Sequence, residues 1–202
     1  MRQRLSKTER RSDILENARQ LIVERGLIAT EMEDIRLACG ISRGGLYHHF
    51  ANKRAVLDAL VEDEVTQLTE VLNDATAPPI VALLQSGSSH LGNDGGVLAG
   101  LASKEEKLDY LSALDEAFAA ILRDALAARL QGFVKPDSNP EHVAELFLTI
   151  NAHINRREIL GLWSSPESAG FAATALSALA PLLKTPSDLD PIIAGLQEEA
   201  QA

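Results

Sequence analysis

The apolar residues of this chain recur every three or four positions over most of its length, which is the spacing of helices with one buried face. The first such stretch runs from Thr8 to Arg25, and Gly26 is the predicted C-terminal stop. No alternation with a period of two extends far enough to predict a strand, and no internal repeat is present. The predicted fold class is therefore all-α. The predicted buried face of the first helix is Ile14, Leu15, Ala18, Leu21 and Ile22.

Two short helices are predicted between residues 30 and 50. Thr30 and Glu33 have the spacing of a capping box, and the helix that they open runs to about Cys39. Ser42 caps a second helix, which runs from Arg43 to about Phe50. With the three-residue turn between them, these helices have the arrangement of a helix-turn-helix.

Longer helices are predicted in the rest of the chain. Asn52 caps one that runs through Leu72. Residues 76–80 are a breaker, and residues 86–96 are the most loop-like stretch. Further helices are predicted from about 108 to 132, from 140 to 163 with Asn139 as N-cap, from 166 to 183 with Ser165 as N-cap, and from 190 to 199.

The stretch CGISRGGLYHHF, residues 39–50, carries the densest candidate chemistry. A phosphate-binding loop is disfavoured because no lysine follows the glycines and no strand precedes them. A metal site is disfavoured because adjacent helical residues point about 100° apart, so His48 and His49 cannot share one ion. Cys39 is expected to be a small packing residue, with a redox sensor as the alternative. No metal or other cofactor is predicted.

Helical-wheel geometry favours a helix that reads DNA. At about 100° per residue, Leu46 and Phe50 fall on one edge, which is the predicted buried side. His49 flanks that side, so packing is its expected role. Two glycines in a helix cost about 1 kcal/mol each relative to alanine, but they let the backbone approach a DNA groove closely. The opposite face carries Gly44, Gly45, Tyr47 and His48, with Arg43 reaching out from the first turn.

Composition adds a division of charge. The 202 residues are 46% hydrophobic and have a net charge of −10, which by itself argues against binding nucleic acid. Residues 1–54, however, hold 11 Lys and Arg against 7 Asp and Glu, whereas residues 55–202 hold 8 against 22. A polyanion would be attracted to the first quarter of the chain. The single cysteine excludes an internal disulfide and suits a reducing cytosol. No apolar run approaches the roughly 18 residues of a membrane span. A cytoplasmic protein is therefore expected.

Residues 11–61 resemble the N-terminal DNA-binding domain of the TetR family of transcriptional repressors. The resemblance implies a DNA-binding domain over residues 1–54, a linking helix at about 52–72, and an effector-binding and dimerisation domain over residues 55–202. The matching positions are Ala18, Leu21, Gly26, Thr30, Ile35, Ala38, Gly40, Ser42, Gly44, Leu46, Tyr47, His49, Phe50, Lys53 and Leu57.

The resemblance also implies the residues that contact DNA. Arg43, Gly45 and His48 would lie near bases, and Tyr47 would contact a base or a phosphate. Arg36 stands where the family usually has alanine, and it either adds a phosphate contact or only lies along the rim. The basic arm (Arg2, Arg4, Lys7, Arg10 and Arg11) either adds phosphate contacts or is only a solubilising tail. The expected phosphate contacts are Thr30, Ser42 and Lys53, near helix N-termini.

The second part of the chain is expected to pair two copies and to bind an effector. The resemblance implies that the helices at 140–163 and 166–183 form a four-helix bundle with those of a second copy. The candidate effector residues are Phe118, Phe147, Asn151, His153 and Trp163. The alternatives are a core role for the aromatic residues and a polar dimer rim or a solvent face for the polar ones. No catalytic constellation is found.

These observations predict a DNA-binding regulator rather than an enzyme. As a repressor it would bind a near-palindromic operator as a homodimer and be released by a small-molecule effector. The alternatives are a transcriptional activator, an effector-independent DNA-binding protein of the same fold, or a helical enzyme.

Overall fold

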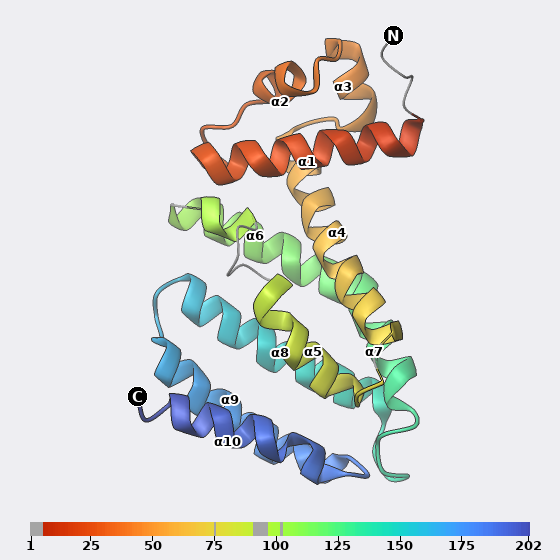
Figure 1. Cartoon of the computed structure of the whole chain (residues 1–202), viewed down its shortest axis with the longest axis vertical. Coiled ribbons are helices and arrows are strands. Elements are labelled where there is room, and N and C mark those ends of the chain that lie inside the picture. Colours follow the sequence, from red (N-terminus) through yellow and green to blue (C-terminus); the bar gives the residue numbers. More distant parts are fainter. Residues whose placement is uncertain (1–5, 75, 91–96, 102) are drawn as a thin grey trace. The chain divides into compact units, whose positions relative to one another are not determined.

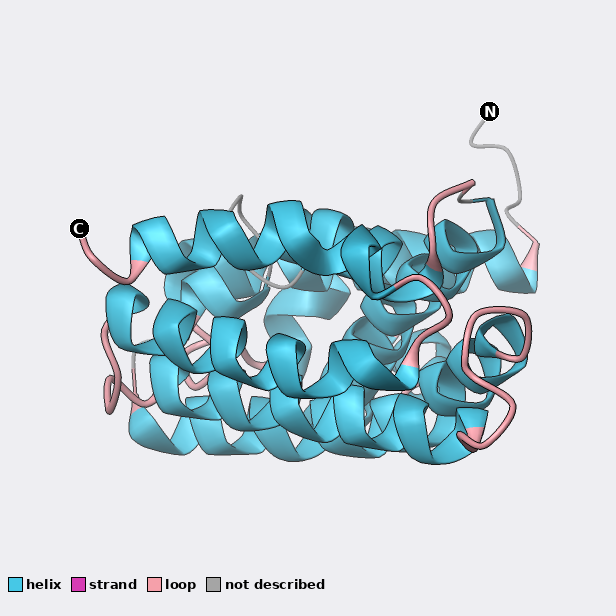
Figure 2. Cartoon of the chain, turned by 90° about the horizontal axis from the view of Figure 1, so that it is seen from below, coloured by secondary structure: helices cyan, strands magenta, loops and turns pink. Residues whose placement is uncertain are grey.

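The computed structural model describes residues 6–74, 76–90, 97–101 and 103–202 (Figure 1). Contacts within the chain group it into two compact units, residues 1–64 with 89–114 and residues 65–88 with 115–202. Over the described residues the chain is helical (Figure 2). The only β pairing among these residues is an isolated bridge between Val134 and Leu183. The all-α prediction is confirmed. The predicted division at residue 54 stays a prediction.

The first unit contains the predicted helix-turn-helix. Its elements are α1 (Lys7–Arg25), α2 (Met32–Cys39), α3 (Arg43–His49), the start of α4 (Lys53–Asp74), the short 3₁₀ helix η1 (Val97–Gly100) and most of α6 (Lys104–Ala117). All five residues predicted for the buried face of α1 are buried. The predicted ends also hold, because Gly26 (φ 88°) and Gly40 (φ 62°) adopt the positive φ that ends a helix.

The N-cap of α2 differs from the prediction. Glu31 is the N-cap, and its capping-box partner is Asp34 rather than Glu33. Thr30 cannot take this role because it is buried, and its hydroxyl donates to the carbonyl oxygen of Gly26 at 2.8 Å. The caps predicted for the next two helices are confirmed: Ser42 accepts from the backbone N–H of Gly45, and Asn52 accepts from that of Ala55.

The second unit consists of packed helices. The long helix predicted to end near residue 132 is a continuous run of α6, a π-helical turn (Phe118–Leu122) and α7 (Arg123–Leu130). Helix α8 (Pro140–Ile159) lies against α7 and α9 (Ser165–Leu179), and α10 (Asp190–Glu199) lies against α9. None of the helices over the described residues is both long and apolar enough to cross a membrane.

Several predicted boundaries in this unit are wrong. Helix α5 (Pro79–His90) extends into the stretch predicted as a loop, while residues 91–96 lie outside the described residues. Helix α8 ends at Ile159, before the predicted 163, because the chain turns at Gly161 (φ 65°). Ser164, not Ser165, caps α9. Helix α9 ends at Leu179, and a 3₁₀ turn that contains Pro181 follows it.

Candidate nucleic-acid interface

Helix α3 is held by a cap at its start and by two buried side chains along one edge. Leu46 and Phe50 are 0% and 3% exposed, as predicted from the wheel. At the N-terminus the Ser42 hydroxyl accepts from the Gly45 N–H at 3.1 Å. A seven-residue helix is too short to be stable alone, so these contacts determine its position.

The face of α3 away from the core carries the predicted polar side chains. Arg43, Tyr47 and His48 are exposed, with Tyr47 at 44%. The Arg43 guanidinium lies over the Tyr47 ring, 5.6 Å from its centroid. Among the described residues Arg43 takes part in no ion pair, so its N–H donors remain available to a partner. Arginine and tyrosine are common donors to phosphates and base edges.

The two glycines of α3 differ in what surrounds them. A Cβ on Gly45 would lie 3.2 Å from the Ser42 hydroxyl oxygen, so the helix cap itself favours glycine there. A Cβ on Gly44 would meet nothing within 4 Å. Nothing within the described part of the chain therefore requires glycine at position 44.

The two histidines have different surroundings. His48 is exposed, whereas His49 is half-buried, with its ring 6.5 Å from that of Phe50. Burial lowers the pKa of His49, and the nearby charges of His48, Lys7, Arg10 and Arg11 lower it further. Both effects disfavour the protonated form of His49. These surroundings fit a packing role for His49 and leave His48 open to a partner.

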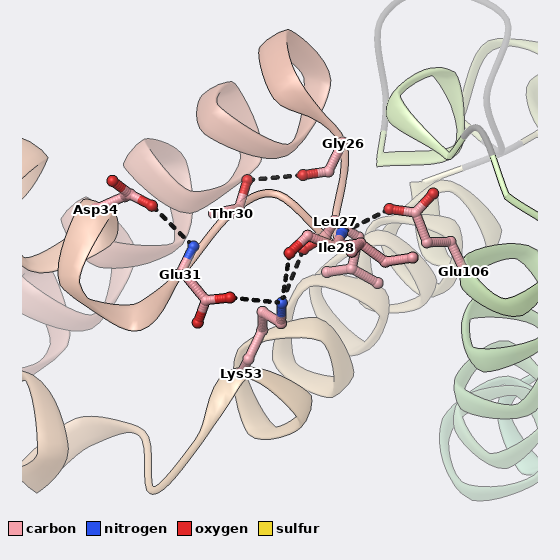
Figure 3. A network of polar contacts seen from close by, with 8 residues as sticks. All are labelled: Gly26, Leu27, Ile28, Thr30, Glu31, Asp34, Lys53 and Glu106. Carbon is pink, nitrogen blue, oxygen red and sulfur yellow. Dashed lines mark hydrogen bonds and ion pairs between the residues drawn. The ribbon is translucent and has the colours of Figure 1, made fainter.

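Two predicted phosphate ligands are engaged within the protein (Figure 3). The Thr30 hydroxyl is buried, as described above, so it has no access to a phosphate in this conformation. The Lys53 ammonium donates to the carbonyl oxygens of Leu27 and Ile28 at 3.0 and 3.1 Å, and lies 3.9 Å from Glu31. An ammonium has three N–H donors, so Lys53 has capacity for one further acceptor.

Arg36 is fixed within the helix-turn-helix. Its guanidinium binds both carboxylate oxygens of Glu33, and one nitrogen donates to the carbonyl oxygen of Ile41 at 2.8 Å. The hydrogen bonds to Glu33 raise the pKa of Arg36 and lower that of Glu33. Arg36 therefore joins α2 to the turn before α3, a role that neither sequence alternative included.

The basic arm is partly helical. Arg2 and Arg4 lie outside the described residues, while Lys7, Arg10 and Arg11 belong to α1. Arg10 pairs with Asp13 at 2.8 Å, and the Arg11 guanidinium lies 5.5 Å from the centroid of the Phe50 ring. Cys39 is buried, and burial raises its pKa to about 11, which disfavours the reactive thiolate and fits a packing role.

Sequence reasoning missed a buried polar cluster in the first unit. Arg19 of α1 donates to Glu64 of α4 at 2.8 Å, and the Tyr110 hydroxyl of α6 donates to the same carboxylate at 3.4 Å. Burial raises the pKa values of both Glu64 and Tyr110. The three residues lie on three separate helices and at least 45 positions apart, so helical spacing gives no sign of the cluster.

The predicted effector residues have different surroundings in the second unit. Phe118 and Phe147 are buried, and the Asn151 amide donates to the carbonyl oxygen of Phe147 in its own helix. His153, Trp163 and the 40% exposed Phe171 form an aromatic cluster with ring centroids 5.1–5.7 Å apart. Of the five candidates only Phe118 lines the groove of about 260 Å³ beside α8, together with Asp115, Ala119, Arg123, Glu145, Leu148, Thr149 and Ala152. No group of three or more metal-ligating side chains occurs among the residues that the structure describes.

Residues 14–60 match the sequence profile described as bacterial regulatory proteins, tetR family. The match covers most of α1, all of α2 and α3, and the start of α4. Over residues 14–60 the chain is thus similar in sequence to the TetR family. The resemblance inferred from residues 11–61 is thereby confirmed.

Relatives and solved structures agree with this assignment. The transcriptional repressor KstR2 of Mycobacterium tuberculosis strain H37Rv is 40% identical over 77 residues, 37% of this chain and 38% of that protein. The repressor AcnR of Corynebacterium glutamicum is 33% identical over 67 residues, 33% of this chain and 36% of that protein. The chain thus matches little more than a third of the length of these HTH-type transcriptional repressors. That the relatives are regulators agrees with the prediction that the chain is not an enzyme.

The likeness in fold extends over most of the chain. GusR of Salmonella enterica aligns with a TM-score of 0.59 at 23% identity, over 89% of this chain and 98% of GusR. The reduced form of NemR of Escherichia coli aligns with a TM-score of 0.56 at 20% identity, over 88% of this chain and 99% of NemR. At these identities the likeness establishes the fold of both units and nothing about ligands.

Proposed function

We propose that this protein is a ligand-responsive transcriptional repressor that binds DNA with helix α3. The observation that carries the proposal is the outer face of α3. There Arg43, Tyr47 and His48 are exposed, and Gly44 leaves the backbone uncovered although nothing in the described chain needs that space. A helix that is packed against the core along one edge, and that lacks a side chain at one position of the opposite face, suits insertion into a major groove.

The roles of individual residues follow from their positions on α3. Arg43, Gly45 and His48 are proposed to lie near base edges, and Tyr47 to contact a base or a phosphate. The N-terminus of α3, where Ser42 caps and Gly44 is open, is proposed to receive a phosphate. Lys53 would bind a phosphate with its third N–H donor while it keeps its two carbonyl contacts.

Two copies are proposed to act together. Helices α8 and α9 would form a four-helix bundle with those of a second chain, placing two α3 helices about one DNA turn, ~34 Å, apart on a near-palindromic operator. In support, these helices and the turn between them carry the exposed apolar side chains Leu146, Leu162 and Phe171. Their apolar area would be removed from water in a dimer.

Release by a small-molecule effector completes the proposal. An effector can shift DNA binding only by its differential affinity for two conformations, typically worth ~1–3 kcal/mol. The groove beside α8 and the aromatic cluster are the candidate effector sites in the second unit. Helices α4, α5 and α6 have residues in both units, so they are the covalent routes for the signal. The protein would act in the bacterial cytoplasm, where the chromosome lies.

The test is binding of the purified chain to fragments of its own upstream region. Affinity should fall steeply as salt rises, because each phosphate contact releases a counterion. Replacing Tyr47 or His48 by alanine should weaken binding without unfolding the protein, whereas alanine at exposed Gln197 of α10 should not. A wild-type chain with no preference for any genomic fragment over random DNA would overturn the proposal. A reporter in a strain that lacks the gene distinguishes repressor from activator by the direction of the change.

A further inference from the structure

One peptide group in the first unit is bound at both ends by charged side chains (Figure 3). This peptide joins Leu27 to Ile28 in the turn after α1. Its N–H donates to Oε1 of Glu106 at 2.6 Å, and its carbonyl oxygen accepts from the Lys53 ammonium at 3.0 Å. A peptide group has a dipole of about 3.5 D with the positive end at N–H. The carboxylate and the ammonium therefore each lie at the end that attracts them.

The side chain of Glu106 is ordered by hydrogen bonds at the start of α6, independently of its contact with this peptide. Its other carboxylate oxygen accepts from the Ser103 N–H at 3.0 Å, and its own N–H donates to the Ser103 hydroxyl at 3.1 Å. These two bonds are the capping box of α6. Because the side chain is only 3% exposed and already ordered by the cap, it offers Oε1 to Ile28 at little further cost in entropy.

The backbone before α6 is also anchored on α1. A Cβ on Gly100 would overlap the carbonyl oxygen of Ile22, so η1 and the last turn of α1 touch backbone to backbone. A Cβ on Gly26 would lie 3.3 Å from the Gly100 carbonyl oxygen and 3.5 Å from Glu106 Oε1. The start of α6 is thus a part of the DNA-binding unit, although it follows α3 by more than fifty residues in the sequence.

At the other end, Lys53 opens the helix that follows α3. Only three residues, Phe50 to Asn52, separate Lys53 from the last residue of α3. Its ammonium is held by two carbonyl oxygens of the same turn, those of Leu27 and Ile28. The position of this turn therefore determines where the Lys53 ammonium lies.

We propose that Glu106 is a positioning residue for DNA binding that acts on Lys53 through the Leu27–Ile28 peptide. Glu106 itself contacts no DNA; it holds the turn whose carbonyl oxygens hold Lys53. The inference rests on the proposed DNA-binding function and adds to it a residue outside the helix-turn-helix.

Replacing Glu106 by glutamine tests the proposal at nearly constant size. In glutamine one of the two carboxylate oxygens is replaced by an NH₂ donor, so either the Ser103 N–H or the Ile28 N–H faces a donor in place of its acceptor. We expect DNA affinity to fall about tenfold, the scale of one charge-assisted hydrogen bond. Glu105→Gln, an exposed neighbour with the same change of charge, is the matched control and should bind like the wild type.

A double-mutant cycle separates positioning from a general loss of structure. If Glu106 acts through Lys53, Glu106→Gln should weaken binding in the wild type but add almost nothing in a Lys53→Met background. An effect of equal size in both backgrounds would show that Glu106 acts independently of Lys53 and would overturn the proposal.

A measurement without DNA keeps the two proposals distinguishable. In the ¹⁵N-labelled chain the Ile28 amide proton should exchange slowly, and Glu106→Gln should speed its exchange and shift its resonance, whereas Glu105→Gln should not. An Ile28 amide that is unchanged by Glu106→Gln overturns the bridge even if the wild type binds DNA. A wild type that binds no fragment overturns the proposed function and, with it, the positioning role, whatever the Ile28 amide shows.

Discussion

Alanine at Gly44 should make the protein more stable and a weaker DNA-binding protein. The added Cβ meets nothing within 4 Å in the free chain, so Gly44→Ala costs no packing. Alanine also has a higher helix propensity than glycine and restricts the unfolded chain. We expect a gain of about 0.5–1 kcal/mol, at the lower end because Gly44 is in the first turn of α3.

On DNA the same methyl group would stand between the α3 backbone and the groove. A steric clash with DNA, or the loss of a backbone contact to it, should cost about 1–3 kcal/mol of binding free energy, which is a fall in affinity of about tenfold or more. Urea unfolding and DNA titration of the same preparations measure the two effects. Opposite signs of the two changes are the expected result.

Gly45→Ala is the matched comparison. Its Cβ would press on the capping hydroxyl of Ser42 at 3.2 Å, so the gain in propensity should be offset by a weaker cap. If Gly44→Ala binds DNA as tightly as the wild type, then Gly44 does not face the groove. The main observation that supports the proposed function, the open outer face of α3, would then be lost.

Three further predictions concern the stability of the first unit. Gly100→Ala should destabilise it by more than about 2 kcal/mol in urea unfolding, because the methyl group overlaps the carbonyl oxygen of Ile22, whereas Gly132→Ala, with nothing within 4 Å, should not. Cys39, with a pKa of about 11 and little exposure, should react with a thiol reagent at pH 8 only as fast as the protein unfolds; rapid labelling of the native protein would contradict its burial. Because the pKa of His49 is lowered in the folded protein, the unfolded state binds a proton at this residue more readily. The free energy of unfolding should therefore fall as pH drops through about 6.5, and His49→Gln should make that fall less steep in unfolding measured between pH 5 and 8.

What the sequence determined by itself lies within single helices and their ends. The buried edge of Leu46 and Phe50, the Ser42 and Asn52 caps and the stops at Gly26 and Gly40 all follow from spacing over a few residues, and the structure confirms them. The resemblance over residues 11–61 depends on the same local features.

Where the sequence failed, a competing contact from outside the local pattern decided the outcome. Thr30 has the right spacing for a cap, but its side chain is buried and its hydroxyl donates to the carbonyl oxygen of Gly26, so Glu31 caps α2 instead.

Only the tertiary structure revealed the bridge between Glu106 and Lys53. Glu106 accepts from an N–H 78 positions earlier, and Lys53 donates to a carbonyl oxygen 26 positions earlier. In the sequence Glu106 is one of two adjacent glutamates at the start of a helix, and nothing separates it from exposed Glu105. Helical periodicity describes each helix relative to its own axis, whereas a hydrogen bond between distant segments depends on how those segments pack. The packing of η1 and α6 on α1 decided which glutamate is buried and which peptide it holds.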